Sequence, residues 1–586
     1  MGLTFARAAG IIAGMAQART QKRWVVAPAA EGIEELAREA GVTPLVAQML
    51  ANRGIVESEA IRAFFRPQLT DLHDPALLNG AATAARRIAE AVRNEERIVI
   101  YGDYDVDGMT SVAILDACLK LVDAKVDFYV PHRLSEGYGL HVEAVDALIA
   151  KGLDLLVTVD CGIGSHEVIQ RCNAAGVDVI ITDHHVPPEQ LPAALAIVHP
   201  NLPGQDYPNP ALAGAGVAYK LSWQIAREIC GTTRVDERFR NFLVETTALA
   251  ALGTIADSVP LIDENRTLAV FGLRAMTQSG NVGLGALLAS TAREGKALTA
   301  TDVSFGLAPR LNAAGRMGHA HQAVELLTSD DPARCKALAA DLETANEQRQ
   351  KVEKAITAEA MEMVHAAGMD QPDCPAIVLA NDAWHGGVIG IVASRMVDRF
   401  GKPAIMIAIN DDGVGQGSGR SIPGFNLQRA IVDCQEHLRS CGGHAMAAGL
   451  KIDPENLPAF VAAFTQRAAS DLGSEDVCPS LPIDAEATLA MLGQSSAERL
   501  ARMAPFGQGN PEPVIALRGC RIVNPPKRMG KRGNHLTMML TQGKGTIRVV
   551  GFGFGDLVET LAGVATVDVA ATPTLDSDAV PRGTTY

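Results

Sequence analysis

Apolar and polar residues follow different periods along the chain, and these periods outline its architecture. Between about residues 79 and 198, short apolar runs alternate with amphipathic helical stretches. The pattern predicts strands at residues 97–101, 126–130, 155–159, 177–182 and 196–198, with helices at 111–122 and 142–151. Strands that alternate with helices form βαβ units and a parallel sheet. We therefore expect an α/β domain here.

The rest of the chain predicts further parts. Residues 28–77 have an amphipathic helical pattern, and helices dominate again at 214–278. A long charged helix is expected at 332–367, where its length and polarity suit a strut between domains. A second α/β unit runs from 376 to about 469. After a turn-rich linker at 473–482, short strands with glycine-bearing turns predict a small β-barrel.

Composition and charge narrow the class of protein. A chain of 586 residues is too long for one core, and its length indicates about three to four domains. Its 52 basic and 67 acidic residues give a net charge of −15, which argues weakly against indiscriminate nucleic-acid binding and leaves a nucleic-acid enzyme open. The ten cysteines form no Cys-x-x-Cys pair, which indicates reduced thiols in a cytosolic protein. No apolar run approaches the roughly 18–20 residues that span a membrane.

The amino-terminal segment, residues 1–23, stands apart from this pattern. It contains no acidic residue and one short, glycine-broken apolar stretch, so a signal peptide or an amphipathic presequence has to be considered. The domain pattern starts at Trp24. We favour a disordered or mis-started extension at residues 1–23.

Three of the predicted strands run directly into acidic or histidine-containing motifs. In chain order, these strand ends carry Asp103, Asp105, Asp107, Asp160, Asp183, His184 and His185. The carboxyl ends of parallel strands lie side by side, so the groups are expected to converge at one edge of the sheet. Clustered carboxylates repel one another, and a bound divalent cation keeps them ionised together. The sequence thus predicts a metal-dependent enzyme that acts on a phosphate.

The first of these motifs has three aspartates at a spacing of two. On an extended segment, Asp103, Asp105 and Asp107 would all face the same way, before a tight turn into a helix that begins near Thr110. Aspartate-rich turns with glycine are also common in ordinary loops, so this motif alone has a purely structural interpretation. A calcium-binding EF-hand loop does not fit, because its twelfth position, normally a glutamate, is Ile114.

The third motif places one carboxylate beside two imidazoles. Adjacent strand residues point to opposite sides, so one histidine is expected in the metal cluster and the other to orient water or phosphate. Carboxylates with one imidazole form a hard site that suits Mn²⁺ or Mg²⁺ better than zinc or copper. Two such ions roughly 3.5–4 Å apart could share Asp160 and activate a bridging water for in-line attack on phosphorus.

The motifs resemble those of the DHH phosphoesterase superfamily, and from about Trp24 the chain is similar to the RecJ family of exonucleases. The resemblance rests on residues 102–111, 130–140, 159–162, 183–185, 212–218, 251–257 and 309–317. It implies metal ligation by Asp105, Asp107, Asp160, His184 and Asp257. Asp103 would be a ligand or a group behind the ligands, while Asp183 and His185 would tune or orient the catalytic centre. Small DHH phosphatases have a metal-binding histidine where this chain offers Tyr101 and Asp103, which leaves the ligand set of the first ion open.

The resemblance also implies a domain order. Together with the sequence pattern, it predicts a disordered extension at 1–23, a helical region at 24–77, a parallel-sheet DHH catalytic domain at 78–330, a connecting helix at 331–368, a substrate-binding α/β DHH-associated domain at 369–472 and an OB-like nucleic-acid-binding barrel at 473–586.

Residues that suit phosphate or strand binding fall in three places. One is near the end of the predicted DHH catalytic domain, where the planar guanidinium group of arginine suits a phosphate. The second is a set of glycine-rich turns that let backbone N–H groups approach a phosphate, and the third is a basic loop on the β-barrel. In that order, the residues are Arg310, Asn312 and Arg316; Ser418, Arg420, Gly442, Gly443 and His444; and Lys527, Arg528, Lys531 and Arg532. The plainer interpretations are salt bridges, packing turns and a solvated face.

The resemblance implies a 5′→3′ exonuclease that degrades single-stranded DNA to mononucleotides in DNA repair and recombination, with two Mn²⁺ or Mg²⁺ ions. We expect a cytoplasmic monomer without membrane contact, supplied with single strands by a helicase and a single-strand-binding protein. One alternative is a DHH phosphodiesterase or oligoribonuclease for cyclic dinucleotides or very short RNA, which would not need the length or the β-domain. A non-catalytic DNA-binding scaffold is the other, and the complete set of metal-type residues argues against it.

Overall fold

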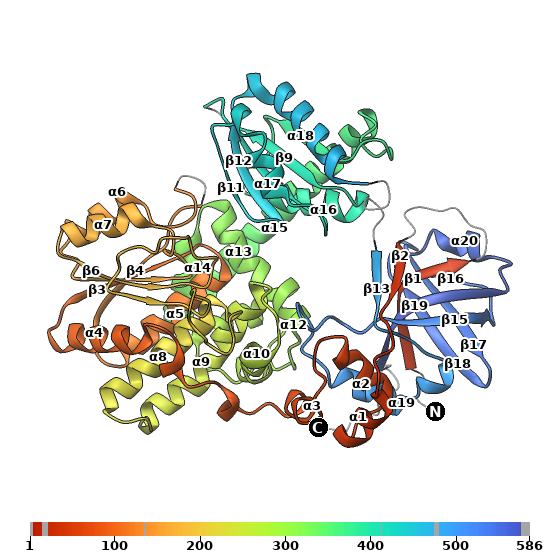
Figure 1. The fold of residues 1–586 in the computed structure, drawn as a ribbon, viewed down its shortest axis with the longest axis horizontal. Helices are drawn as coiled ribbons and strands as arrows, with labels where there is room; N and C mark the ends of the chain where they lie inside the picture. The colour runs from red at the N-terminus through yellow and green to blue at the C-terminus, as the bar shows by residue number, and fades with distance from the viewer. Residues whose placement is uncertain (1–3, 14–21, 134–135, 411, 474–479, 576–586) are drawn as a thin grey trace. The chain divides into compact units, whose positions relative to one another are not determined.

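The computed structural model describes residues 4–13, 22–133, 136–410, 412–473 and 480–575 (Figure 1). The chain forms two compact units. The larger unit consists of residues 67–471 and 507–509, and the smaller unit of residues 1–66, 472–506 and 510–586. Across the described ranges, none of the helices combines the length and apolar character that a membrane crossing requires.

A five-stranded parallel sheet organises the first half of the larger unit. Its strands are β3 (Arg97–Gly102), β4 (Lys125–Tyr129), β5 (Leu155–Val159), β6 (Asp178–Thr182) and β7 (Ala196–Val198), in the order β4-β3-β5-β6-β7. All five were predicted from the sequence, with ends shifted by at most one residue. The strand order reverses at β3, and ligands bind beyond the carboxyl ends of strands at such a switch point. This topology directs attention to the loops after β3 and β5.

Helices cover both faces of this sheet, because successive strand residues point to opposite sides. On β3, Ile98 and Ile100 enter a core shared with helices α4 (Ala81–Arg93), α5 (Val106–Lys120), α8 (Gly214–Cys230) and α9 (Glu237–Ala256). Val99 and Tyr101 enter a second core on the other face, with α6 (Val142–Ile149) and α7 (His166–Ala174). The sheet is therefore fixed from both sides.

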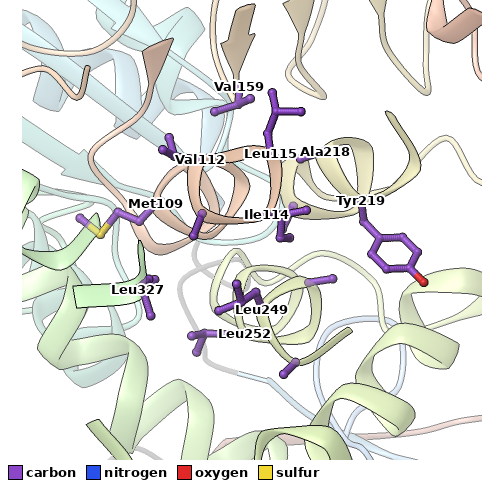
Figure 2. Packing of buried hydrophobic residues seen from close by; sticks show 14 of the residues in the cluster. Met109, Val112, Ile114, Leu115, Val159, Ala218, Tyr219, Leu249, Leu252 and Leu327 are labelled. Atoms are coloured by element: carbon purple, nitrogen blue, oxygen red, sulfur yellow. The ribbon is translucent and has the colours of Figure 1, made fainter. Parts of the chain in front are cut away.

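Helix α5 is buried along almost its whole length and packs against α8 and α9. Figure 2 shows Ile114 of α5 among Ala218 of α8 and Leu249 of α9. The helix begins at Val106, so the predicted start near residue 110 is wrong. Its cap is Asp105, whose side chain accepts the N–H of Gly108 at 3.1 Å. The three aspartates consequently converge through a turn and a first helical turn, and not along an extended segment.

The second half of the larger unit begins with the long helix α15 (Pro332–Ala366), which the charged pattern predicted. It leads to a mixed sheet of β8 (Ile377–Asn381), β9 (Ala404–Ile409), β10 (Gly415–Arg420), β11 (Ser440–Gly443) and β12 (Ala447–Ile452), in the order β11-β12-β10-β9-β8. Helix α16 (Ile389–Phe400) packs on β9 and β10. Between the halves, α10 (Asp263–Met276), a π-helical turn (Val303–Leu307) and α13 (Ala308–Met317) complete the helical layer.

The smaller unit contains the OB-like strands β15 (Ile515–Ile522), β17 (His535–Gln542), β18 (Gly545–Gly551) and β19 (Thr566–Leu575). Strand β15 pairs with both β17 and β19. Strand β1 (Thr4–Ala13) lies between β18 and β19, parallel to the first and antiparallel to the second. The expected disorder of residues 1–23 is therefore wrong for residues 4–13. Their partners come from the far end of the chain, so no local pattern could reveal the pairing.

Three amino-terminal helices share the core of the smaller unit. Helices α1 (Ile33–Ala40), α2 (Pro44–Ala51) and α3 (Ser58–Phe65) contribute side chains such as Leu50 and Phe64, which join Leu517 and Val549 of the OB-like strands. Parallel pairing of β2 (Arg23–Val26) with β13 (Ser480–Ile483) adds a second link. The predicted linker at 473–482 lies partly, and the tail at 576–586 wholly, outside the described residues.

Candidate active site

The predicted metal-ligating residues lie together beyond the carboxyl ends of β3, β5 and β6. Within each of three overlapping groups, one ligand atom per residue lies within 4.8 Å of the others. The groups are Asp103, Asp105 and Asp160; Asp107, His184 and Asp257; and Asp160, His184 and His185. Asp160 and His184 each belong to two groups, so the arrangement offers shared ligands.

The amino terminus of α8 holds the carboxylate of Asp107. This carboxylate accepts the backbone N–H groups of Gly214 at 2.7 Å and Ala215 at 2.9 Å, the first two residues of the helix. A helix amino terminus favours negative charge, which suits this contact. A Cβ atom at Gly214 would lie 2.7 Å from Oδ1 of Asp160 and 2.8 Å from Oδ2 of Asp107. Only glycine allows the helix to approach so closely.

Asp160 follows β5 in an unusual backbone conformation. Its φ of 60° lies in the left-handed region, which costs a non-glycine residue about 1–3 kcal/mol and is concentrated at functional sites. Its N–H donates to the carbonyl of Thr182 at 3.0 Å, so β6 supports the turn. The turn brings Oδ1 of Asp160 within 3.0 Å of Nε2 of His184.

The two histidines of the triplet after β6 make different contacts. Nε2 of His184 faces the aspartates, while Nδ1 of His185 lies 2.7 Å from Oδ1 of Asp183. Asp183 also accepts the N–H groups of Ile163 at 3.0 Å and His184 at 2.8 Å. Burial acts to raise the pKa of Asp183, but the hydrogen bond and positive charge of His185 lower it to about 2. Asp183 therefore fixes the His185 ring.

The same environment keeps His184 neutral, because burial and then the charge of His185 lower its pKa to about 4. A neutral imidazole has a lone pair for a metal ion. The aspartates show the opposite shift. Burial, followed by neighbouring carboxylates, raises the pKa of Asp107 to about 7 and of Asp257 to about 9. The pKa values of Asp103 and Asp160 also lie well above the usual range.

Several buried atoms of this cluster lack partners. Within the described part of the chain, Oδ1 of Asp103 makes no hydrogen bond, and neither do Oδ1 of Asp160 and Nε2 of His184, although these two atoms lie only 3.0 Å apart. An unpaired buried polar atom costs about 1–3 kcal/mol, and repelling carboxylates add to this. A divalent cation would satisfy these atoms, and the oxygen-rich donor set fits Mn²⁺ or Mg²⁺. Tyr101 is no ligand here, because its buried hydroxyl donates to the carbonyl of Gly139 at 3.3 Å.

Arginines gather next to the carboxylates. Burial, followed by the positive charges of Arg133, Arg349 and Arg420, lowers the pKa of Arg316 to about 9. Nη1 of Arg316 donates to the carbonyl of Gly387 at 3.0 Å. Arg133 was not predicted as a site residue, although it follows β4, whose carboxyl end adjoins that of β3. A cluster of like charges suits an anion with several oxygens, such as a phosphate.

Ser418 and Arg420 lie on β10 near the first turn of α16. Nη1 of Arg420 donates to Oγ of Ser418 at 3.2 Å. A Cβ atom at Gly390 in that turn would come within 2.8 Å of the Ser418 hydroxyl and 3.1 Å of Arg420 Nη2. On the neighbouring hairpin β11–β12, the predicted residues Gly442, Gly443 and His444 are all exposed. The end of this sheet thus combines a helix amino terminus with an arginine, a combination that binds anions.

Two of the arginines that were predicted to bind a nucleic-acid strand form ion pairs with carboxylates of the protein. Arg310 forms a two-pronged ion pair with Glu343 of α15, including an Nη2–Oε1 distance of 3.0 Å. This is the salt bridge that the sequence left as the plainer interpretation. In the smaller unit, Arg528 pairs with Glu559 at 2.8 Å, whereas Lys527, Lys531 and Arg532 are exposed.

Comparisons with known proteins agree with this geometry. Three family models match in chain order: the DHH family N-terminal domain at residues 97–254, the DHHA1 domain at 373–470 and the RecJ OB domain at 483–577. The single-stranded-DNA-specific exonuclease RecJ of Dickeya dadantii is 37% identical over 484 residues, which cover 80% of this chain and 83% of that protein. The chain belongs to the RecJ family.

Other RecJ proteins extend the comparison. RecJ of Bacillus subtilis is 38% identical, over 92% of this chain and 67% of that protein. The crystal structure of Thermus thermophilus RecJ in complex with Mn²⁺ has a TM-score of 0.78 and 32% identity, with coverage of 94% of this chain and 78% of that one. The Mg²⁺ complex of RecJ from the same organism has a TM-score of 0.72 and 30% identity, with coverage of 94% and 77%. The metal-type groups of this chain fit both ions.

Proposed function

We propose that this RecJ-family protein is a metal-dependent 5′→3′ exonuclease that hydrolyses single-stranded DNA to mononucleotides in DNA repair and recombination. One observation carries the proposal: a buried cluster of carboxylates and a neutral histidine lies beside arginines that repel one another. The first group needs cations and the second needs an anion. A phosphodiester held with divalent metal would satisfy both.

The carboxylate cluster would hold the metal. We assign this role to Asp103, Asp105, Asp107, Asp160, His184 and Asp257. Bound divalent ions polarise phosphoryl oxygens and lower the pKa of water. The chain contributes preorganised ligands, since α8 fixes Asp107 and the turn after β5 fixes Asp160. Asp183 would keep the His185 ring oriented toward the substrate phosphate or the attacking water.

The arginines would position the strand. The forks of Arg133, Arg316 and Arg420, with Ser418 and the amino terminus of α16, are suited to phosphate oxygens. Asn312 and the exposed turn at 442–444 are further candidates for contacts to the strand. In the smaller unit, exposed Lys527, Lys531 and Arg532 would contact the backbone, as basic OB loops do. Arg310 and Arg528 would serve mainly as ion-pair partners of Glu343 and Glu559.

The wider setting of the enzyme follows from its substrate class. Single strands arise where duplex DNA is opened, so we assign the protein a cytoplasmic role as a monomer that receives DNA from a helicase and a single-strand-binding protein. We also propose domain limits at 78–330, 369–472 and 473–586, joined by a helix at 331–368. The three family matches fall within the first three ranges.

A single-stranded oligonucleotide labelled at either end tests the proposal in Mn²⁺, with a blunt duplex as control. We expect release of the 5′ label as a mononucleotide and a shortening ladder from the 3′-labelled strand. Equal digestion of the duplex, or an uncut single strand, would overturn the proposal. Far faster turnover of a dinucleotide than of a long strand would favour the small-substrate alternative.

A further inference from the structure

A pocket of about 520 Å³ opens in the larger unit beside the metal-type residue Asp257. Ala256 and Ser258, the residues on either side of Asp257, form part of its wall. Helices α13, α15 and α16 and the π-helical turn supply the rest, including Asn312 and Arg316. The residues that flank Asp257 thus form one part of the pocket wall, and the pocket extends along the connecting helix α15.

The charged residues of this pocket favour an anionic ligand. Its lining includes the cations Arg316, Arg349, Lys354 and Arg395, against a single acid, Glu353. Glu353 is buried and accepts hydrogen bonds from both Arg349, at 2.6 Å, and Arg395. Lys354 is exposed. The excess of positive charge matches the phosphates of a nucleic-acid strand.

One aromatic side chain in the pocket wall, that of Phe305, is largely exposed to solvent. Phe305 is 79% exposed, more than any other large hydrophobic residue in the described part of the chain. It lies on the π-helical turn, whose Val303, Gly306 and Leu307 are buried and anchor the backbone. Single π-helical turns are rare and are frequent at functional sites. The turn presents a phenyl ring to solvent on a fixed support.

We propose that Phe305 is a stacking platform for an unpaired base, and that the pocket holds the nucleotide adjoining the one that is cleaved. This inference rests on the proposed nuclease function and adds a substrate contact to it. A base stacks on an aromatic ring whatever its sequence, because every base has a π-face. A paired base has its faces covered by neighbours in the duplex. The contact therefore favours single strands without selecting a sequence.

Abasic substrates test this stacking directly. The substrates are oligonucleotides with one abasic position placed successively from the 5′ end, and the enzymes are the full-length wild type, Phe305→Ala and Phe305→Trp. For the wild type, one abasic position is expected to lower kcat/KM about 5- to 150-fold, the range for loss of one stacked base. Phe305→Ala should lose a similar factor on the intact strand and little more on that abasic strand. Phe305→Trp should retain activity.

The contact is identified by the one abasic position whose loss in kcat/KM does not multiply with the loss caused by Phe305→Ala. A purely structural defect would instead multiply with the loss at every abasic position. Val244→Ala is the matched control, because Val244 on α9 is also an exposed hydrophobic residue, with 51% of its surface accessible to solvent. Circular dichroism and melting temperature check that each variant is folded. Independent, multiplicative losses at every position, or a Phe305→Ala enzyme as active as the wild type, would overturn the proposal. Failure of the nuclease assignment itself would differ, because the wild type would then leave the unmodified strand uncut.

Discussion

The backbone N–H of Gly214 lies 2.7 Å from Oδ2 of Asp107, so the first residue of one buried helix holds a carboxylate from the first turn of another. The contact joins α8 to α5 at the carboxyl edge of the sheet. It leaves Asp107 aimed at His184, with 3.7 Å between Oδ2 and Nε2. The geometry of the carboxylate and histidine cluster therefore depends on the packing of two helices as well as on the loops after the strands.

Replacement of Gly214 should disable the enzyme without changing any charge. In Gly214→Ala, the new Cβ atom would push against the carboxylates of Asp160 and Asp107. A misplacement of about 1 Å costs roughly 100-fold in rate, so kcat/KM on a 5′-labelled strand should fall by about that factor. Gly285→Ala on α11 (Val282–Ser290) is the control, because a Cβ there meets no atom within 4 Å. Equal activity of the two variants would contradict the prediction.

Asp160→Asn separates charge from backbone conformation. Asparagine tolerates the positive φ at this position, whereas alanine adds strain. We expect Asp160→Asn to lose at least about 100-fold in kcat and to melt no lower than the metal-free wild type, because one repelling carboxylate has gone. Asp160→Ala should be equally inactive and less stable. Full activity of either variant would exclude the proposed role of Asp160.

Divalent metal should stabilise the folded protein. A ligand that binds only the native state adds about 2.7 kcal/mol to the free energy of unfolding at 100 times its Kd. We expect Mn²⁺ or Mg²⁺ to raise the melting temperature of chelator-treated protein. Asp257→Asn should reduce that rise, whereas Asp341→Asn, at an exposed position on α15, should leave it intact. An equal rise in both variants would place the bound metal elsewhere.

Arg420 should contribute through its fork as well as its charge. Arg420→Ala is expected to weaken binding of a single strand about 10- to 150-fold, the range for a hydrogen bond to a charged group. Arg420→Lys should recover only part of this affinity, because lysine lacks the two-pronged geometry. Arg429→Ala, at an exposed position on α17 (Leu427–Val432), is the control. Fluorescence anisotropy would measure these affinities. Each enzyme would also carry a substitution of a proposed metal ligand, so that the strand is bound but not cleaved.

The basic loop of the smaller unit should affect long strands through salt-dependent binding. The logarithm of the affinity for a single strand falls linearly with the logarithm of the salt concentration, with a slope of about −0.7 per neutralised phosphate. The double variant Lys531→Ala/Arg532→Ala should therefore reduce the slope by about 1.4 for a long oligonucleotide and leave a trinucleotide unaffected. Arg528→Ala should change it less, since Arg528 pairs with Glu559. An unchanged slope in the double variant would remove the loop from the binding surface.

The sequence predicted the parts of the fold that depend on local periodicity. The parallel strands have apolar runs that stop at charged motifs, so both the sheet and the strand-end carboxylates were visible from the chain alone. The start of α5 was missed because Asp105 works as a helix cap. A segment with three aspartates fits either an extended strand end or the capped start of a helix, and only the contacts of the aspartates distinguish the two.

Contacts between distant segments were beyond sequence reasoning. The pairing of Arg310 with Glu343 requires the packing of α13 on α15, and the strand β1 requires partners at the other end of the chain. Arg133 could have been found by treating the end of β4 like the other strand ends. Phe305 carried no signal, because a single phenylalanine in an apolar segment normally indicates core.

The shared core of α2, α3 and the OB-like strands has a consequence for how the protein is made. During synthesis, residues 23–66 emerge before the larger unit, yet their partners at 480–575 emerge after residues 67–471. The intervening 67–471 form a unit with its own core, so it can fold while the early helices are still unpaired. Closure of so long a loop is slow when the loop is unfolded and easier once it is compact. Folding of the larger unit first therefore shortens the separation that the two ends of the chain must close in order to pair.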